Sequence, residues 1–497
     1  MENLSNYKKP LPTSPEEGGQ LLHSPRYADV LISFLHHVIH KMVHLKNTFK
    51  QDRAVRMNSP FRGLGGLLLF IFVSSWLNSF SQRKDILLNN DWYSIATNND
   101  QLLSANTYQV NIDNNWKKVN IPHNWDQYEG YRRLLHGNRH GDSWYRKTFT
   151  TKQAKPGKRF FLFFEGVGSY ATVYLNNKKV GEHAGGRTTF TIDVTDVIKT
   201  DGTVNQLAVR AYHPSNIKDL PWVCGGCSDE RGFSEGSQPM GIFRPVHLMV
   251  TNDVRIEPFG VHAWADISAD KIQLNITATV KNYSQKNRSA VVEHKLIDAT
   301  GKVIALVTGK SLTVGKNETI EQQSEITNLK SKIKLWSIEH PYLYKIITTV
   351  KENNIVLDQS ETEFGFRTIN WKNPSHQFTL NGQPVFINGI AEYEHLLGQS
   401  HAFSNEQIRS RFKWLQSAGF NAFRVAHQPH NLLYGQLCDE KGILWWTQLS
   451  AHVWYDSPEF RKNFKQLLKE WVIERRNSPS IILWGLQNES KLPEDFA

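Results

Sequence analysis

The sequence has few cysteines, no block of like charge and no nucleotide-binding signature. Three of its 497 residues are cysteines, and the pair Cys224 and Cys227 lacks a second pair or a nearby histidine. A zinc site is therefore a poor interpretation, and a local disulfide stays open for an exported chain. The net charge of +11 is spread along the chain without a Lys/Arg run. We therefore expect no nucleic-acid partner and no nucleotide, flavin or nicotinamide cofactor.

No apolar run is as long as a membrane-spanning helix requires. The run over residues 63–77 falls short of the roughly 20 residues needed. Arg62 precedes it and small residues follow, which indicates a signal peptide cleaved before Gln82. We expect residues 57–81 to be this signal peptide and residues 1–56 to result from a start codon assigned too early. The chain would then be exported, periplasmic or secreted, without a stable membrane anchor; a signal anchor is the alternative.

The region after the signal peptide is typical of packed β domains. Aromatic residues make up 11 % of the chain, including 15 tryptophans. Residues 85–252 show short alternating segments, with Asn176-Asn177 as a hairpin turn, and predict a jelly-roll sandwich. Residues 253–368 alternate cleanly, as in Leu274–Val280, and predict an immunoglobulin-like β-sandwich.

From residue 369 to residue 497 the pattern changes to alternating strands and helices. Ser404 and Gln407 form a capping box that starts the first helix, which Gly419 ends. A (β/α)8 TIM barrel needs about 250 residues, so we expect the N-terminal half of one. The predicted strands are Val385–Asn388, Phe420–Val425, Ile443–Thr447 and Ile481–Leu486.

The last predicted strand ends in two polar residues that are candidates for catalysis. The apolar run Ile481–Leu486 is followed by Gln487 and then by Asn488 and Glu489. Barrel enzymes place their chemistry at the C-terminal ends of such strands. A solvated loop carboxylate is the structural alternative for Glu489.

Several short motifs follow one another along the chain. They are Ile121–Trp125, Ser143–Arg146, Val173–Asn176, Gly241–Arg244, His340–Tyr344, Phe364–Arg367, Asn421–His427 and Asn488-Glu489. In this order they resemble glycoside hydrolase family 2, which includes β-galactosidases, β-glucuronidases and β-mannosidases. The similarity spans about residues 85 to 497 and includes the jelly-roll, immunoglobulin-like and barrel regions.

The resemblance implies a retaining mechanism with two carboxyl groups about 5–5.5 Å apart. It assigns Glu489 as the acid/base and Asn488 as the partner of the sugar 2-hydroxyl. Arg424, His427 and His395 would contact substrate. The nucleophile would lie on a later strand, beyond the chain end, so we expect this chain alone to be inactive.

The resemblance favours an exported exo-acting β-glycosidase, with β-galactosidase as the first interpretation and β-glucuronidase as the nearest alternative. A non-catalytic carbohydrate-binding protein is the competing class. Retaining hydrolysis requires no cofactor; a Mg²⁺ or Na⁺ ion near the site stays open, as does assembly into a homo-oligomer.

Each substrate-contact assignment has a structural alternative. Arg424 would equally suit a salt bridge inside the barrel, and His395 could pair with Glu392 or Glu394. The chain also departs from the family pattern. Ser478 stands where the family has histidine, and Gln428 where tyrosine is common, which weakens any transfer of sugar specificity.

Overall fold

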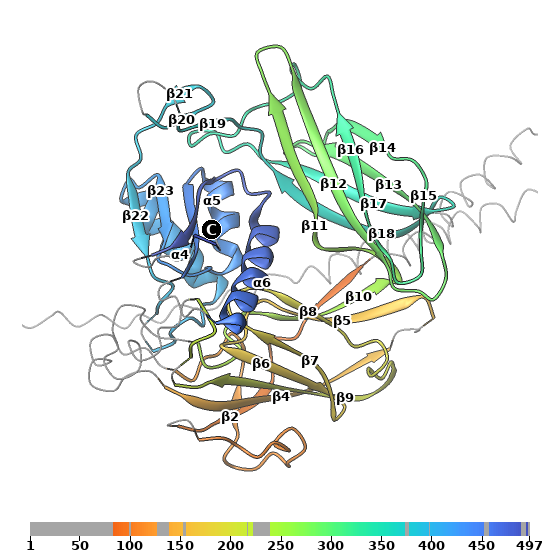
Figure 1. Ribbon diagram of the computed structural model, residues 1–497, viewed down its shortest axis with the longest axis vertical. Coiled ribbons are helices and arrows are strands. Elements are labelled where there is room, and N and C mark those ends of the chain that lie inside the picture. Colours follow the sequence, from red (N-terminus) through yellow and green to blue (C-terminus); the bar gives the residue numbers. More distant parts are fainter. Residues whose placement is uncertain are drawn as a thin grey trace, which may run out of the picture. The chain divides into compact units, whose positions relative to one another are not determined.

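The computed structural model describes the chain from Arg83 onward, with gaps (Figure 1). Glu489, the pair Cys224 and Cys227, and residues 1–82 with the expected signal peptide lie outside the described residues. In the part that is described, no helix is both long and apolar enough to cross a membrane. The described ranges are 83–98, 101–126, 139–152, 156–215, 217–221, 239–372, 377–396, 398–451, 457–488 and 494–495.

The first region is an antiparallel β-sandwich, which confirms the expected fold. Within the described residues its two sheets have the orders β1-β10-β5-β8 and β3-β2-β4-β9-β6-β7. Trp92, Phe164 and Val209 are fully buried between them. The strands are β1 (Lys84–Leu87), β2 (Trp92–Ala96), β3 (Lys117–Val119), β4 (Gly141–Lys152), β5 (Lys158–Phe164), β6 (Tyr170–Leu175), β7 (Lys178–Ala184), β8 (Phe190–Asp193), β9 (Asp201–His213) and β10 (Val246–Asn252).

The hairpin between β6 and β7 turns at the predicted position. Asn176 and Asn177 have φ angles of 49° and 65°, the left-handed conformation that a two-residue type I′ turn requires at both central positions. Asparagine tolerates this conformation better than most residues. The Asn176 amide also donates to the Val197 carbonyl at 3.0 Å, which fixes the turn against the sandwich.

The second region is also a β-sandwich, as the alternating pattern predicts. In the described residues one sheet has the order β11-β12-β16 and the other β14-β13-β17-β18, with β15 beside β13. Leu274, Ile276 and Val280 of β12 are buried in the core. The strands are β11 (Val254–Ile267), β12 (Ile272–Asn282), β13 (Arg288–Ile297), β14 (Val303–Thr308), β15 (Leu312–Val314), β16 (Thr319–Ile326), β17 (Tyr344–Glu352) and β18 (Ile355–Phe364).

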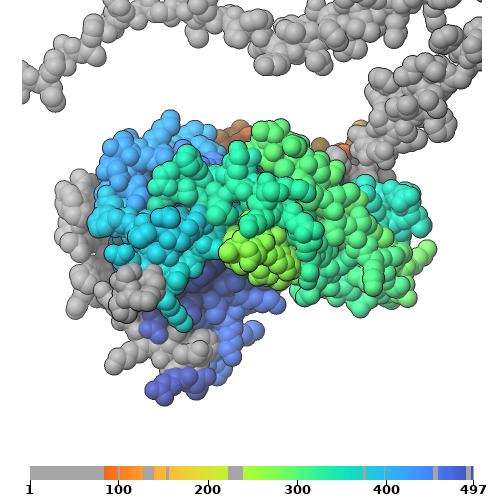
Figure 2. Space-filling model, turned by 90° about the horizontal axis from the view of Figure 1, so that it is seen from above, coloured from red at the N-terminus to blue at the C-terminus, as the bar shows by residue number. Residues whose placement is uncertain are grey.

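The third region begins with the small antiparallel sheet β19 (Ile369–Asn370), β20 (Thr379–Leu380) and β21 (Gln383–Pro384). Then, among the described residues, four parallel strands follow in the order β22-β23-β24-β25, with helices α4 to α6 between them. This is the expected partial barrel, coloured cyan to blue in Figure 2. Its elements are β22 (Gly389–Glu392), α4 (Asn405–Ser417), β23 (Ala422–Val425), α5 (Leu432–Lys441), β24 (Leu444–Ala451), α6 (Pro458–Arg475) and β25 (Ile481–Gln487).

The prediction of a strand at Val385–Asn388 is wrong, because the first parallel strand starts at Gly389. The Asn421 side chain hydrogen-bonds to backbone groups of this segment that would otherwise pair with a neighbouring strand. Its Nδ2 donates to the Phe386 carbonyl at 2.7 Å, and its Oδ1 accepts from the Asn388 N–H at 2.8 Å. The segment before Gly389 is therefore held by the Asn421 side chain together with single backbone bonds, such as that from the Asn421 N–H to the Asn388 carbonyl at 2.9 Å, and not by a β ladder.

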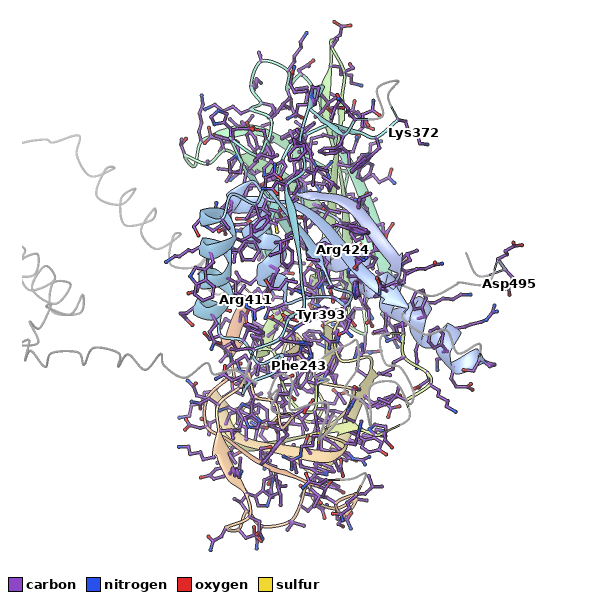
Figure 3. All side chains as sticks on the ribbon, turned by 90° about the vertical axis from the view of Figure 1, so that its left-hand side faces the viewer. Phe243, Lys372, Tyr393, Arg411, Arg424 and Asp495 are labelled. Atoms are coloured by element: carbon purple, nitrogen blue, oxygen red, sulfur yellow. The ribbon has the colours of Figure 1, made fainter. Side chains whose placement is uncertain are left out.

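Helix α4 begins at the predicted capping box. The Ser404 hydroxyl accepts from the Gln407 N–H at 3.3 Å, and the Gln407 side chain accepts from the Ser404 N–H at 2.8 Å. Gly419, with a φ of 78°, follows the C-cap as expected. Ile408, Phe412 and Leu415 face the core. The helix therefore packs these apolar side chains into the core. Figure 3 labels Arg411 on this helix and Arg424 on β23, the strand that follows it.

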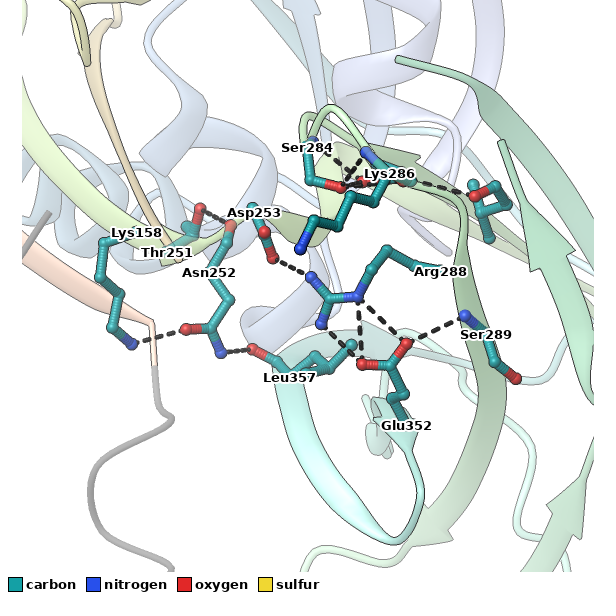
Figure 4. Close-up of polar contacts among 12 residues, drawn as sticks. Lys158, Thr251, Asn252, Asp253, Ser284, Lys286, Arg288, Ser289, Glu352 and Leu357 are labelled. Carbon is teal, nitrogen blue, oxygen red and sulfur yellow. Dashed lines mark hydrogen bonds and ion pairs between the residues drawn. The ribbon is translucent and has the colours of Figure 1, made fainter. Parts of the chain in front are cut away.

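A polar cluster lies at the start of the second sandwich (Figure 4). The Arg288 guanidinium donates to Asp253 at 2.8 Å and to Glu352 at 2.7 Å. Nearby, the Lys158 ammonium of the first sandwich donates to the Asn252 side chain at 2.6 Å. The Asn252 amide donates in turn to the Leu357 carbonyl of β18. These contacts fix the short connection that joins the two sandwiches.

Candidate active site

The predicted site residues belong to strand ends that meet at one edge of the parallel sheet. Arg424 lies on β23, in register with Ala391 of β22 and Trp446 of β24. Asn488 follows directly after β25. Because the carboxyl ends of parallel strands meet at one edge, residues about 60 positions apart come together.

Arg424 connects two of these strand ends. Its Nη2 donates to the Asn488 Oδ1 at 3.1 Å, and its guanidinium carbon lies 4.4 Å from the centre of the Trp446 ring. Among the described residues, no carboxylate lies within ion-pair distance of Arg424, so the alternative of a structural salt bridge has no partner in this part of the chain. The guanidinium is held by an amide and an aromatic face instead.

His427 is the centre of a second set of contacts. Its Nδ1 lies 3.0 Å from the Gln448 Oε1, and its Nε2 lies 3.3 Å from the Tyr393 hydroxyl. The Arg424 Nη2 lies 3.4 Å from the same Nδ1. The imidazole is thereby fixed between three strand ends.

His395 lies beside this cluster. Its ring stacks on Tyr393 at 5.5 Å and meets His401 edge-on at 4.8 Å. The carboxylates of Glu392 and Glu394 pair with arginines: Glu392 with Arg411 and Glu394 with Arg244. Tyr393 contacts both histidines, since its ring stacks on His395 and its hydroxyl lies 3.3 Å from the His427 Nε2.

The sequence interpretation did not single out Tyr393 or Gln448. Both share the strand-end position that identified Asn488. Tyr393 comes directly after β22, and Gln448 lies in the second half of β24. Neither is a carboxylate or histidine, so residue type gave no reason to select them. Strand-end position is the feature that would have found both.

Ser478, the departure from the family pattern, lies at the opposite end of β25 from Asn488. Its hydroxyl donates to Asp439 of α5, and the Ser480 N–H donates to the same carboxyl oxygen at 3.0 Å. Burial raises the pKa of Asp439 to about 7, although these hydrogen bonds oppose the shift. The Ser478 difference therefore affects the amino end of the strand and has no contact with the candidate site.

A cavity of about 820 Å³ has a lining that includes none of Tyr393, Arg424, His427, Gln448 and Asn488. Its lining includes His247 of the first sandwich, Phe259 of the second, and Ser404 and Leu432 at the starts of α4 and α5. The strand-end cluster is the better candidate, because charged, amide and aromatic groups from several of the described strands converge there.

Among the described residues, no group of three or more His, Cys, Asp or Glu side chains has the geometry to hold a metal ion. The strand-end cluster is instead made of an arginine, a histidine, amides and aromatic rings. Such groups hydrogen-bond hydroxyls and pack against the apolar face of a sugar ring.

Three models of glycosyl hydrolase family 2 domains match the chain. The galactose-binding domain-like model matches residues 130–219, the family 2 model residues 254–367, and the TIM barrel domain model residues 372–497. These matches follow the same order as the two sandwiches and the parallel sheet.

Curated relatives and solved structures agree with this assignment. A beta-glucuronidase of Bacteroides fragilis is 26% identical over 86% of this chain and 59% of its own length. A beta-galactosidase of Thermoanaerobacter pseudethanolicus is 30% identical over 71% of this chain and 46% of its own. The crystal structure of a Bacteroides uniformis beta-glucuronidase superposes with a TM-score of 0.72 at 26% identity, covering 82% and 47% of the two chains.

Two β-sandwiches followed by parallel β/α units are the arrangement that the three matching domain models describe. The chain belongs to family 2 of the glycosyl hydrolases. It spans about half the length of the curated relatives that it matches.

Proposed function

We propose that this chain is part of an exported, retaining exo-β-glycosidase that removes terminal β-linked galactose from oligosaccharides or polysaccharides. Glu489 is the acid/base and Asn488 binds the sugar 2-hydroxyl, while Arg424, His427 and His395 contact substrate or hold those that do. The contact that carries the proposal is the hydrogen bond of 3.1 Å between Arg424 and Asn488. It directs the amide beside Glu489 toward the shared strand edge.

The second carboxylate of the retaining pair is proposed to come from outside these 497 residues. A nucleophile must lie about 5–5.5 Å from the acid/base with a free oxygen. The two carboxylates that follow β22 are already bound by guanidinium groups, Glu392 by Arg411 and Glu394 by Arg244 at 2.9 Å. Neither suits that role, so the 497-residue chain is expected to bind glycosides without hydrolysing them. The mechanism itself requires no cofactor, and a Mg²⁺ or Na⁺ ion beside the site would have an accessory role.

Calorimetric titration of the 497-residue chain tests this function. Methyl β-D-galactopyranoside should bind, methyl α-D-galactopyranoside should bind more weakly, and Arg424→Met should reduce the affinity for the β-anomer. In parallel, 4-nitrophenyl β-D-galactopyranoside should be hydrolysed no faster with the protein than in buffer alone. Robust turnover would contradict the proposed position of the nucleophile, and equal binding of both anomers would contradict the specificity.

A β-glucuronidase is the second candidate, because a relative with that name matches 86% of the chain, against 71% for a β-galactosidase. Methyl β-D-glucuronide in the same titration separates the two sugars. A carbohydrate-binding protein without catalysis would bind sugar through residues 83–368, and Arg424→Met would then leave binding unchanged.

A further inference from the structure

Arg244 of the first sandwich reaches into the loops of the parallel sheet. It follows Gly241 in the segment before β10, and its side chain is only 1 % exposed. Its Nη1 donates to the Arg187 carbonyl at 2.8 Å. Its Nη2 donates to the Glu394 carboxylate at 2.9 Å and to the Pro429 carbonyl at 2.7 Å. One guanidinium thus joins a sandwich loop to two different loops at the strand ends.

These two loops carry the residues that contact each other in the site. Glu394 follows Tyr393 directly, and Pro429 comes two residues after His427. Tyr393 and His427 hydrogen-bond at 3.3 Å across the gap between the loops. The distance between the loops is therefore set both at the site and, behind it, by Arg244.

Glu394 extends the same connection into α5. Its second oxygen accepts from the N–H of Asn431, the N-cap of this helix, at 2.8 Å. Burial raises the pKa of the Glu394 carboxyl, but Arg244, His430, the Asn431 N–H and Arg187 together lower it by more, so the pKa lies below its usual value. The carboxylate is therefore charged and has donors on both oxygens.

Gly166 leaves room for the Arg244 side chain, and Arg187 lies beside it. A Cβ at Gly166 would lie 2.9 Å from the Arg244 Cδ, so a larger residue there would displace the guanidinium. The neighbouring Arg187 places its Nη2 3.0 Å from the His401 Nε2. His401 in turn meets the His395 ring edge-on. The sandwich thus contacts the site loops at two points.

We propose that Arg244, acting through Glu394 and the Pro429 carbonyl, is a positioning residue that sets how Tyr393 and His427 face the sugar. This inference rests on the proposed function only for the identity of the ligand. Catalytic and binding groups lose much of their effect when displaced by about 1 Å, so a buried fork behind two loops has direct consequences for binding. A purely structural ion pair would affect stability alone.

Arg255 offers a matched control. It is also a buried arginine that contacts another region: its Nη2 lies 2.9 Å from Glu257, and its guanidinium carbon lies 3.5 Å from the centre of the Phe161 ring. Its described partners Glu257, Tyr283 and Phe161 all lie in the two sandwich regions. Arg255→Met should destabilise the chain without altering the strand ends.

The test uses the 497-residue chain with ¹³C-labelled histidine, and His427→Gln assigns the His427 signal. Arg244→Met should shift the His427 Cε1–H signal and weaken binding of methyl β-D-galactopyranoside about tenfold. Arg244→Lys keeps the charge but not the fork, and should recover only part of the loss. Arg255→Met should leave both readouts at their wild-type values.

Unchanged His427 signals in folded Arg244→Met and Arg244→Lys would overturn the proposal, as would an equal shift in Arg255→Met. Should neither arginine variant fold, Glu394→Gln, which has the same shape, decides by the same two readouts. If the wild-type chain binds no glycoside while the His427 signal still depends on Arg244, the positioning role stands and the proposed function fails.

Discussion

The first sandwich and the parallel sheet differ in how their strands are covered. In the sandwich, strand β6 alternates between buried and half-buried residues, and Trp92 of β2 is fully buried. In the parallel sheet, β23 is largely buried, but the outer strands β22 and β25 are more exposed. Ile390 on β22 and Trp484 on β25 are 39% and 41% exposed.

This difference shows that, in the described structure, the sandwich buries its apolar side chains more completely than the parallel sheet does. Two sheets facing each other bury apolar residues from both. In the parallel sheet, each inner strand has a hydrogen-bonded neighbour on both sides. The outer strands β22 and β25 each have a neighbour on one side only within the described residues. Exposed apolar side chains on such edges promote association with other chains. We therefore expect the sandwich to determine stability and the sheet to determine solubility.

Paired tryptophan substitutions test this comparison with the largest expected effect. Trp92→Ala removes a fully buried ring whose Nε1 donates to the Leu88 carbonyl at 2.6 Å. We expect it to lower the free energy of unfolding by about 4 kcal/mol. Trp484→Ala, on the exposed edge against Trp471, should cost about 1 kcal/mol. Urea unfolding measures both, and equal losses would contradict the comparison.

The second prediction concerns pH and the helix layer of the parallel sheet. Burial raises the pKa of Asp439 to about 7, above the 3.8 of the exposed group. Between these values the folded chain binds a proton that the unfolded chain does not, so stability falls as the pH rises through this window. Below it, the stabilising contribution is fully present.

Asp439→Asn removes this titration and keeps an acceptor for Ser478 and Ser480. Between pH 5 and pH 8 the wild-type chain should lose about 2 kcal/mol of stability relative to the variant. Thermal unfolding at several pH values measures the difference. Parallel stability profiles for the two proteins would mean that Asp439 does not titrate in this range.

The third prediction concerns an inner strand. Arg424→Met removes the donor to Asn488 and should weaken glycoside binding about tenfold, or about 1.4 kcal/mol. The control is Arg409→Met on α4, where an exposed arginine lies 4.0 Å from Glu440. Its affinity should match the wild type. Titration calorimetry distinguishes the two, and an equal loss in both would place the effect outside the site.

The smallest change in stability is expected for a substitution on β25, the outer strand of the parallel sheet. Leu486 on β25 is exposed, so Leu486→Lys should change the free energy of unfolding by less than about 0.5 kcal/mol. A charge on an edge strand opposes association, and the fraction of aggregated protein should fall. Light scattering after concentration measures this. Unchanged aggregation would show that the outer strands are not its source.

Local signals in the sequence predicted much of the fold. The capping box of Ser404 and Gln407 and the Asn176-Asn177 turn act over a few residues, and the structure places both as expected. The start of the first parallel strand was misplaced, because it depends on Asn421, a side chain more than 30 residues away. Long-range competition for backbone groups leaves no local signal.

The site was predictable where residue type and strand-end position coincided. Arg424 and Asn488 met both conditions, and they contact each other. Gln448 met only the condition of position. Arg244 was noted as part of a motif, but its reach to Glu394 depends on packing between two regions far apart in sequence. A motif identifies a residue without showing which loops it joins.

The contacts of α6 with the first sandwich have a consequence for how such chains diversify. The Glu470 carboxylate accepts from Thr188 at 2.7 Å, and a Cβ at Gly185 would lie 2.4 Å from the Leu467 Cδ2. A sandwich borrowed from another chain would have to reproduce both the hydroxyl and the missing side chain. Recombination at the boundary between the sandwich and the barrel segment would therefore separate partners that depend on each other.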